Sequence, residues 1–143
     1  MMLTLVIITA FIIWFSSIWI AVLSLMSFIG GWKKLSRIYP SASSCIKNND
    51  VKYHMSSMKM GFVNYRLCIN ITFTGTGILI ETLKIFSVMH RPIFIPYNKI
   101  SDVQTGKVFS TYTAFTVEDK KITIYGKAGE ELSSRLSSRG TSK

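Results

Sequence analysis

The sequence has 143 residues, with 17 Lys and Arg against 7 Asp and Glu, and a formal net charge of +10. It is nevertheless 48% hydrophobic and only 17% charged, which is more apolar than a typical basic nucleic-acid-binding protein. The length excludes a multidomain enzyme and allows one ordinary domain, or a small domain joined to a membrane segment. Two cysteines, Cys45 and Cys68, exclude a disulfide-dense secreted scaffold and a multi-cysteine zinc or iron–sulfur site.

The apolar excess lies at the N-terminus. Residues 1–32 carry no charged side chain, and residues 3–29 form an apolar run that is about 40 Å long as a helix. A bilayer has a hydrocarbon core of about 30 Å, so this run predicts a transmembrane helix. The alternatives are a buried core helix, which rarely lacks every charge, and a cleaved signal peptide. A signal peptide has a basic start, a shorter apolar stretch and a small-residue cleavage site. This N-terminal segment has no basic side chain, a longer apolar run and no such cleavage site.

The residues that follow the apolar run predict its orientation. Lys33, Lys34 and Arg37 come directly after it, and only the amino terminus is positive before it. The positive-inside rule therefore predicts a single-pass protein with its N-terminus outside and its C-terminal part in the cytoplasm. Trp32 and Tyr39 are expected at the membrane interface with these three cations, although a topology signal alone also explains the cations.

Residues 30–50 are expected to connect the membrane helix to a domain. Trp32, Leu35 and Tyr39 recur at helical spacing, so one or two helical turns are predicted up to Pro40, which ends the helix. Residues 40–49 are polar and rich in turn-forming residues, and they predict a loop.

From residue 51 the apolar period changes from 3.6 to 2, which indicates strands. The clearest strand covers residues 65–73, with Tyr65, Leu67, Ile69, Ile71 and Phe73 on one face. Further strands are predicted over residues 51–60, 78–86, 93–95, 100–105, 109–117 and 121–125. Prolines flank the third of them, so it is expected at an edge of the sheet or at the end of a strand. A helix is predicted over residues 127–138, and residues 140–143 are expected to fray.

This order predicts a fold class. About seven short strands followed by one helix, over residues 51–139, predict a strongly bent antiparallel sheet or partly open barrel whose end the helix covers. The order resembles the pleckstrin-homology-like (PH-like) architecture.

Two segments resemble those of a family of small uncharacterised bacterial single-span membrane proteins. Residues 31–40 (GWKKLSRIYP) are similar to the family's G-W-x-x-L-A-x-x-Y segment, and residues 90–100 (HRPIFIPYNKI) to its H-P-P-L-x-I-P-W-x-x-I block. The likeness covers roughly residues 30–105, with Ser36, Arg91 and Tyr97 as departures. It implies a PH-like cytoplasmic domain at the bacterial inner membrane, and it supplies no catalytic residues.

The sequence offers few groups for catalysis. His54 and His90 belong to no metal-binding motif, and Cys45 and Cys68 lack the local signature of a cysteine nucleophile. Thr74-Gly75-Thr76-Gly77 is a hairpin turn rather than a phosphate-binding loop. We therefore expect a protein without catalytic activity, metal or cofactor. The alternative is a small membrane-bound enzyme with a site built from a cysteine with His54 or His90.

The remaining positive charge suggests a binding surface. Lys52, Lys59, Arg66, His90 and Arg91 form the candidate binding patch, whose expected partner is an anionic lipid headgroup or a membrane protein. A solvated basic face is the alternative. A tethered nucleic-acid-binding domain is a third hypothesis, but the sequence has no RNA-binding aromatic motif and no recognition helix.

Overall fold

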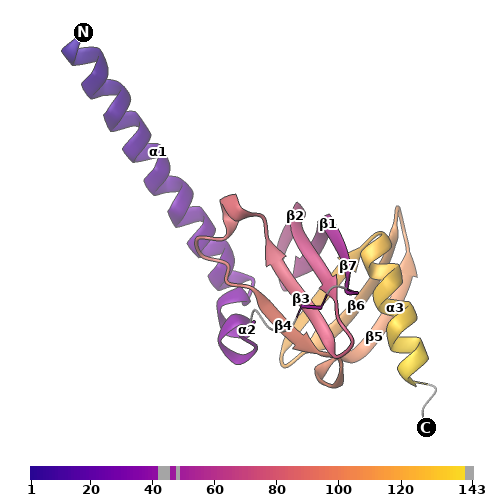
Figure 1. Cartoon of the computed structure of the whole chain (residues 1–143). Helices are drawn as coiled ribbons and strands as arrows, with labels where there is room; N and C mark the ends of the chain where they lie inside the picture. The colour runs from indigo at the N-terminus through magenta and orange to yellow at the C-terminus, as the bar shows by residue number, and fades with distance from the viewer. Residues whose placement is uncertain (42–45, 48, 141–143) are drawn as a thin grey trace.

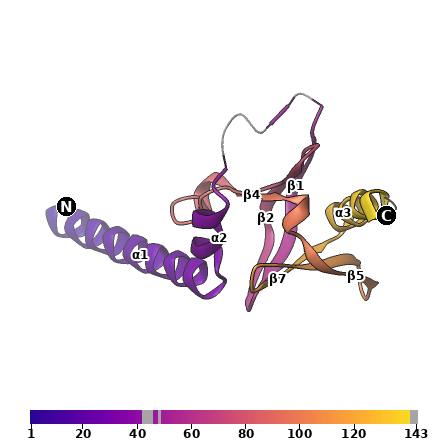
Figure 2. The ribbon, with the colours of Figure 1, turned by 90° about the horizontal axis from the view of Figure 1, so that it is seen from below.

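A long helix leads into a domain built on a curled sheet in the computed structural model of the chain, which describes residues 1–41, 46–47 and 49–140 (Figure 1). Helix α1 (Met2–Ile29) points away from the domain, and the short helix α2 (Trp32–Ile38) lies at the junction. Helix α3 (Lys127–Gly140) packs on the sheet at the opposite side of the domain (Figure 2). The predicted fold class, an apolar N-terminal helix, a bent antiparallel sheet and one C-terminal helix, is confirmed.

The sheet contains seven antiparallel strands in the order β4-β3-β2-β1-β7-β6-β5. Strand β1 joins its two halves, since it pairs with β2 on one side and with β7 on the other. The edge position predicted for the segment between the prolines is confirmed, because β4 is an outermost strand. The strands are β1 (Val51–Met60), β2 (Val63–Phe73), β3 (Gly77–Thr82), β4 (Ile93–Pro96), β5 (Ser101–Lys107), β6 (Thr111–Val117) and β7 (Lys120–Tyr125).

The hydrophobic core lies inside the curl of the sheet. Alternate residues of the strands point inward, and Ile71 and Phe73 of β2, Ile80 of β3 and Phe115 of β6 are fully buried there. Helix α3 closes this core with Leu132, which is also fully buried. The short helix α2 belongs to the same core, because Trp32 and Leu35 are each 0% exposed.

The predicted apolar face of β2 is wrong at one position. Leu67 is 60% exposed, whereas the other residues of that face are buried. Its φ angle is +52°, and Met55 on the paired strand has a φ angle of +51°. The register of β1 and β2 shifts twice in this region, between Tyr53 and Ser56 and between Ser56 and Met58. These bulges break the two-residue alternation that the prediction assumed.

The strand predicted over residues 78–86 is shorter than expected. It ends at Thr82, and Lys84–Phe86 forms a 3₁₀ turn. This turn begins the β3–β4 loop, which we define as residues 83–92. The loop turns out of the sheet toward α1, and it supplies one wall of the candidate site (Figure 1).

Helix α1 is long and apolar enough, by length and composition, to cross a membrane. Its side chains are exposed over most of its length, and Leu23 and Ser27 in its last two turns are the ones buried against the domain. Gly31 then adopts a left-handed conformation with a φ angle of +80°, which separates α1 from α2. This break turns α2 so that its apolar side faces the sheet core.

Candidate functional site: a basic hollow beside the apolar helix

A hollow of about 960 Å³ lies where α1, α2 and the β3–β4 loop meet. Three of its lining residues are the cations Lys33, Arg37 and Arg91, which are all exposed. Serine hydroxyls from α1 and α2 add hydrogen-bonding groups, and apolar side chains complete the wall. These further residues include Ser24, Ser27, Ser36, Leu25, Phe28, Val88 and Met89.

Two of the cations come from the outward face of α2. Lys33 and Arg37 are four residues apart, so they lie one turn above each other on the same side of the helix. The opposite side carries Trp32 and Leu35, which are buried in the core. Burial of that side therefore directs both cations into the hollow.

Arg91 reaches the same hollow through hydrogen bonds that attach the β3–β4 loop to the helices. The indole Nε1 of Trp32 donates to the backbone carbonyl of Arg91 at 2.8 Å. The hydroxyl of Ser27 in α1 donates to the backbone carbonyl of Met89 at 3.0 Å. Arg91 thus lies beside α2, although 54 residues separate it from Arg37 in the sequence (91 − 37).

A buried histidine stabilises this arrangement. His90 is 1% exposed, with its Nε2 3.2 Å from the Tyr65 hydroxyl and its Nδ1 3.1 Å from the Phe86 carbonyl. Burial lowers the pKa of His90 and raises that of Tyr65, so the ring and the phenol are both neutral near pH 7. The consistent assignment is that the Tyr65 hydroxyl donates to Nε2 while Nδ1–H donates to the carbonyl. His90 is therefore a positioning residue for the loop.

Among the described residues, no carboxylate forms an ion pair with a cation of the hollow. The ion pairs of residues 1–41, 46–47 and 49–140 are Lys34–Asp119, Lys52–Glu81 and Arg135–Glu131, and none of them includes a cation of the hollow. Three positive charges therefore face one cavity directly beside an apolar helix. Such a site attracts an anion, and its apolar wall also fits hydrocarbon groups.

The residues predicted at the membrane interface divide into two groups. Lys33 and Arg37 line the hollow, but Lys34 pairs with Asp119 at 2.8 Å and lowers the pKa of that carboxyl. Trp32 and Tyr39 are in the domain core and not on an interfacial surface. The Tyr39 hydroxyl donates to a Glu118 carboxylate oxygen at 2.5 Å, and burial together with this carboxylate raises the pKa of Tyr39 to about 12.

The five residues of the candidate binding patch do not form one surface. Lys52 lies 3.8 Å from Glu81, Arg66 is exposed on β2, and Lys59 lines a second hollow. His90 is excluded from any surface by its burial. Only Arg91 reaches the basic hollow, where its neighbours are Lys33 and Arg37. The serine pair Ser24 and Ser27, spaced by one turn near the end of the apolar run, is the sequence signal that the prediction missed.

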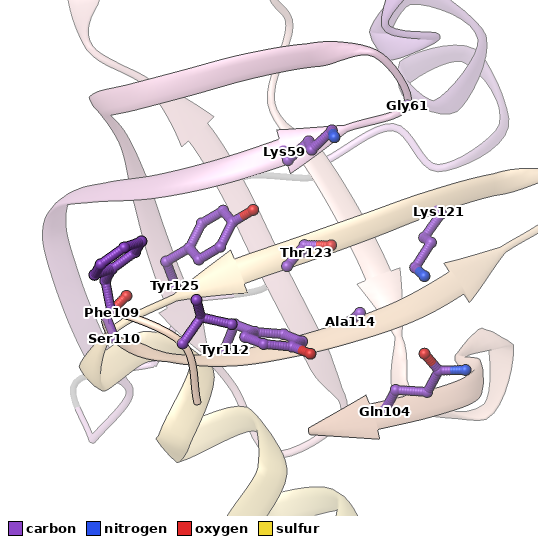
Figure 3. Close-up of a pocket in the computed structure, with 11 residues that line it drawn as sticks. Lys59, Gly61, Gln104, Phe109, Ser110, Tyr112, Ala114, Lys121, Thr123 and Tyr125 are labelled. Atoms are coloured by element: carbon purple, nitrogen blue, oxygen red, sulfur yellow. The ribbon is translucent and has the colours of Figure 1, made fainter. Parts of the chain in front are cut away.

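The second hollow, of about 550 Å³, lies on the outer face of the sheet (Figure 3). Tyr112 and Tyr125 from neighbouring strands supply its aromatic wall, and Lys59 and Lys121 supply two cations. It has fewer cations than the hollow beside α1, and it lacks the direct continuation into an apolar helix.

No contact between a cysteine and a histidine supports the alternative enzyme site within residues 1–41, 46–47 and 49–140. His54 is exposed, and His90 is hydrogen-bonded to the Tyr65 hydroxyl and to the Phe86 carbonyl. Burial raises the pKa of Cys68, which disfavours the thiolate that a nucleophile requires. Cys45 lies outside the described residues. Within the described part of the chain, no group of three or more metal-ligating side chains occurs.

Comparison with known proteins gives a similarity of structure and none of sequence. No protein-family model matches the sequence, and no curated protein matches it. Among solved structures, the chain is similar to a Vps36 N-terminal PH domain, with a TM-score of 0.47 and 13% sequence identity. That match covers 71% of this chain and 88% of the PH domain.

Proposed function

We propose that the protein is a membrane-anchored, non-enzymatic interaction module of PH-like type, in which the basic hollow binds an anionic lipid headgroup. In this proposal α1 crosses the bilayer and the sheet domain lies at its cytoplasmic face. The observation that carries the proposal is that Lys33, Arg37 and Arg91 converge on one hollow beside the end of an apolar helix.

The position of the hollow favours a lipid over a soluble anion. Lys33 and Arg37 follow the apolar helix closely, at the level where phosphate groups of a bilayer lie, and Arg91 lines the same hollow. The same cavity contains the apolar side chains Leu25, Phe28 and Val88, which suit the upper part of an acyl chain. A basic side chain near an anionic leaflet contributes about 1 kcal/mol, so three of them give about 3 kcal/mol when they act together.

The orientation and the location follow from the same charges. The positive-inside rule assigns the side that carries Lys33 and Arg37 to the cytoplasm. The resemblance of residues 31–40 and 90–100 to a bacterial single-span family stays a prediction, and with it the bacterial inner membrane. Cysteine labelling of intact cells at an exposed residue of the domain tests this topology, because a cytoplasmic domain is protected from a membrane-impermeant reagent.

The lipid proposal is tested best at Arg91. Neutralising Lys33 or Arg37 also changes the topology signal, whereas Arg91 is too far from α1 in the sequence to affect it. We expect Arg91→Gln to lower the binding of phosphatidylglycerol to the full chain about fivefold, as measured by native mass spectrometry from nanodiscs of mixed phosphatidylglycerol and phosphatidylcholine. The expected binding also weakens as the salt concentration rises.

Arg66→Gln is the matched control, since Arg66 is an exposed arginine that does not line the hollow. We expect it to leave the lipid ratio unchanged. An equal loss in both variants would show that the domain attracts anionic lipid through its overall charge and not through the hollow. If neither variant changes lipid binding, the hollow does not bind a headgroup, and a protein partner becomes the better hypothesis.

A further inference from the structure

The β3–β4 loop runs along the side of α1, beyond the point where the sheet domain ends. The Phe86 ring packs against the Trp19 ring with 5.9 Å between their centroids. Met89 contacts the same helix eight residues nearer its end, where its carbonyl accepts the hydrogen bond from Ser27. The loop therefore follows α1 for about 12 Å, at the helical rise of 1.5 Å per residue. Figure 1 shows it beside the lower half of α1, between that helix and β2.

The position of Trp19 fixes how deep the loop reaches. Helix α1 has 28 residues, and about 20 of them are enough to cross the hydrocarbon core. Every run of 20 residues within Met2–Ile29 contains Trp19, whichever end of the helix projects from the bilayer. If α1 crosses the membrane, its neighbour Phe86 is then at the level of the hydrocarbon core in all of these positions.

The side chains of the loop suit that environment. Ile85 is 64% exposed, Val88 66% and Met89 42%, so the loop has three exposed apolar side chains, of which Val88 and Met89 also line the basic hollow. They continue the exposed apolar surface of α1, where Val22 is 47% exposed. Lys84 is the charged residue at the start of the loop, and its long aliphatic stem allows the ammonium group to reach the headgroup level.

Part of the loop backbone is hydrogen-bonded within the chain, which reduces the number of polar groups that a lipid environment would leave without a partner. The amides of Phe86 and Ser87 donate to the carbonyls of Leu83 and Lys84 at 2.8 and 3.2 Å. The amide of His90 donates to the carbonyl of Ser87 at 3.2 Å. The carbonyls of Phe86 and Met89 accept from His90 and Ser27, as described above. These bonds attach the loop to α1 and fix its two ends relative to each other.

We propose that the β3–β4 loop inserts into the bilayer beside α1 and is a second membrane-embedded element, with Ile85 and Val88 in contact with acyl chains. This inference rests on the proposed function, because it requires α1 to cross the membrane. It adds that the domain is held against the bilayer at two points and cannot rotate freely about the Gly31 junction. Attachment at these two points keeps the basic hollow, which lies between the loop and α2, at the headgroup level.

The test measures the depth of single fluorophores in the full chain. The natural cysteines are first replaced (Cys45→Ser and Cys68→Ala). Three separate proteins then carry a single new cysteine, at Ile85→Cys, Ile8→Cys or Thr76→Cys, to which an environment-sensitive nitrobenzoxadiazole label is attached. Each protein is inserted into vesicles of phosphatidylcholine and phosphatidylglycerol. Ile8 reports the anchor. Thr76 is exposed in the turn at the other end of β3, and it is the matched control for a domain residue in water. Quenching by nitroxide-labelled lipid is compared with quenching by iodide.

We expect the label at position 85 to behave like that at position 8, with strong quenching by lipid and protection from iodide. The label at position 76 is expected to show the reverse. If position 85 behaves like position 76 while position 8 remains in the lipid, the loop proposal is wrong and the anchor stands. If position 8 and a label at Ile13→Cys, which lies in every run of 20 residues of α1, are both exposed to iodide, both proposals fail.

Two further outcomes also decide the question. If the cysteine replacements unfold the domain, benzoylphenylalanine at position 85 of the natural chain gives the same test, and crosslinks to phospholipid support insertion. Crosslinks from that position to another protein, without crosslinks to lipid, would overturn the proposal by showing that a partner covers the loop.

Discussion

The indole of Trp32 donates a hydrogen bond to the backbone carbonyl of Arg91 at 2.8 Å, and its ring is 0% exposed. This contact links the first residue of α2 to the loop that carries a cation of the basic hollow. The Trp32 ring also packs against Tyr65 and His90, with centroid distances of 5.4 and 5.1 Å. The geometry of the hollow therefore depends on the core packing of one aromatic residue.

Two substitutions of Trp32 distinguish how much its packing and its hydrogen bond each contribute to the stability of the domain. We expect Trp32→Ala to destabilise the domain by about 3–5 kcal/mol, because it leaves a large cavity in the core. Trp32→Phe keeps much of the packing and loses the donor to Arg91, so about 1–3 kcal/mol is expected. Thermal unfolding of the detergent-solubilised chain measures both. Trp14→Phe, at a position that is 62% exposed on α1, is the control and should leave the transition unchanged.

The fold was largely predictable from the sequence because its signals are local. The alternation over residues 65–73, the proline pair around β4 and the apolar run of α1 each need only neighbouring residues. Leu67 shows the limit, since a bulge with a positive φ angle interrupts the alternation at this residue without a sign in the sequence. The helical spacing of Trp32, Leu35 and Tyr39 predicted α2, but not that its apolar face enters the domain core.

The candidate site was predicted less well because it depends on long-range contacts. Arg91 was expected beside Lys52 and Arg66, whereas the Trp32 and Ser27 hydrogen bonds carry it to Lys33 and Arg37. His90 looked like a member of a basic patch because its burial cannot be read from one sequence. The pairing of Lys34 with Asp119 likewise joins residues 85 positions apart.

The stability of the domain should decrease as the pH falls below neutral, because of His90. Its pKa in the folded chain is lowered from 6.5 by burial, so the unfolded chain binds a proton at a higher pH than the folded chain does. The favourable contribution of neutral His90 is therefore present above pH 6.5 and is lost as the pH falls through its lower folded pKa. Protonation also removes the acceptor for Tyr65, whose raised pKa keeps it neutral throughout.

Melting temperatures measured from pH 7.5 to pH 5 in two histidine variants test this assignment. His54→Gln should retain the decrease in stability, because His54 is exposed. His90→Gln should have a lower melting temperature at pH 7.5 and a flatter pH profile. A steep decrease in His90→Gln that equals that of the natural chain would show that another group is responsible.

Gly31 is expected to be required for the junction between α1 and α2. Its φ angle is +80°, and a left-handed conformation costs a residue with a side chain about 1–2 kcal/mol. A Cβ atom at this position would also lie 2.6 Å from Cε of Lys120. We expect Gly31→Ala to destabilise the domain by about 1–2 kcal/mol in chemical unfolding, because the Lys120 side chain is flexible and can move while the backbone cannot.

Two further variants separate strain from crowding at this junction. Lys120→Ala removes the nearby side chain, and the cost of Gly31→Ala should remain in that background. Gly75→Ala should have little effect, because nothing lies within 4 Å of a Cβ atom built there. Full rescue by Lys120→Ala would mean that crowding, and not backbone strain, limits this position.

Two contacts attach α2 to the β6–β7 turn, and we expect them to differ in strength. The Tyr39 hydroxyl donates to Glu118 at 2.5 Å, and its ring is largely buried. The Lys34–Asp119 pair is exposed, with side chains 52% and 60% accessible.

The substitution Tyr39→Phe removes a hydrogen bond to a charged acceptor and should lower the free energy of unfolding by about 1–2 kcal/mol in chemical unfolding. Lys34→Met should have little effect, because solvent and salt screen an exposed pair. Raising the salt concentration should therefore leave the effect of Tyr39→Phe nearly unchanged. If Lys34→Met proved the more destabilising variant, the exposed ion pair and not the buried tyrosine would hold α2 to the turn.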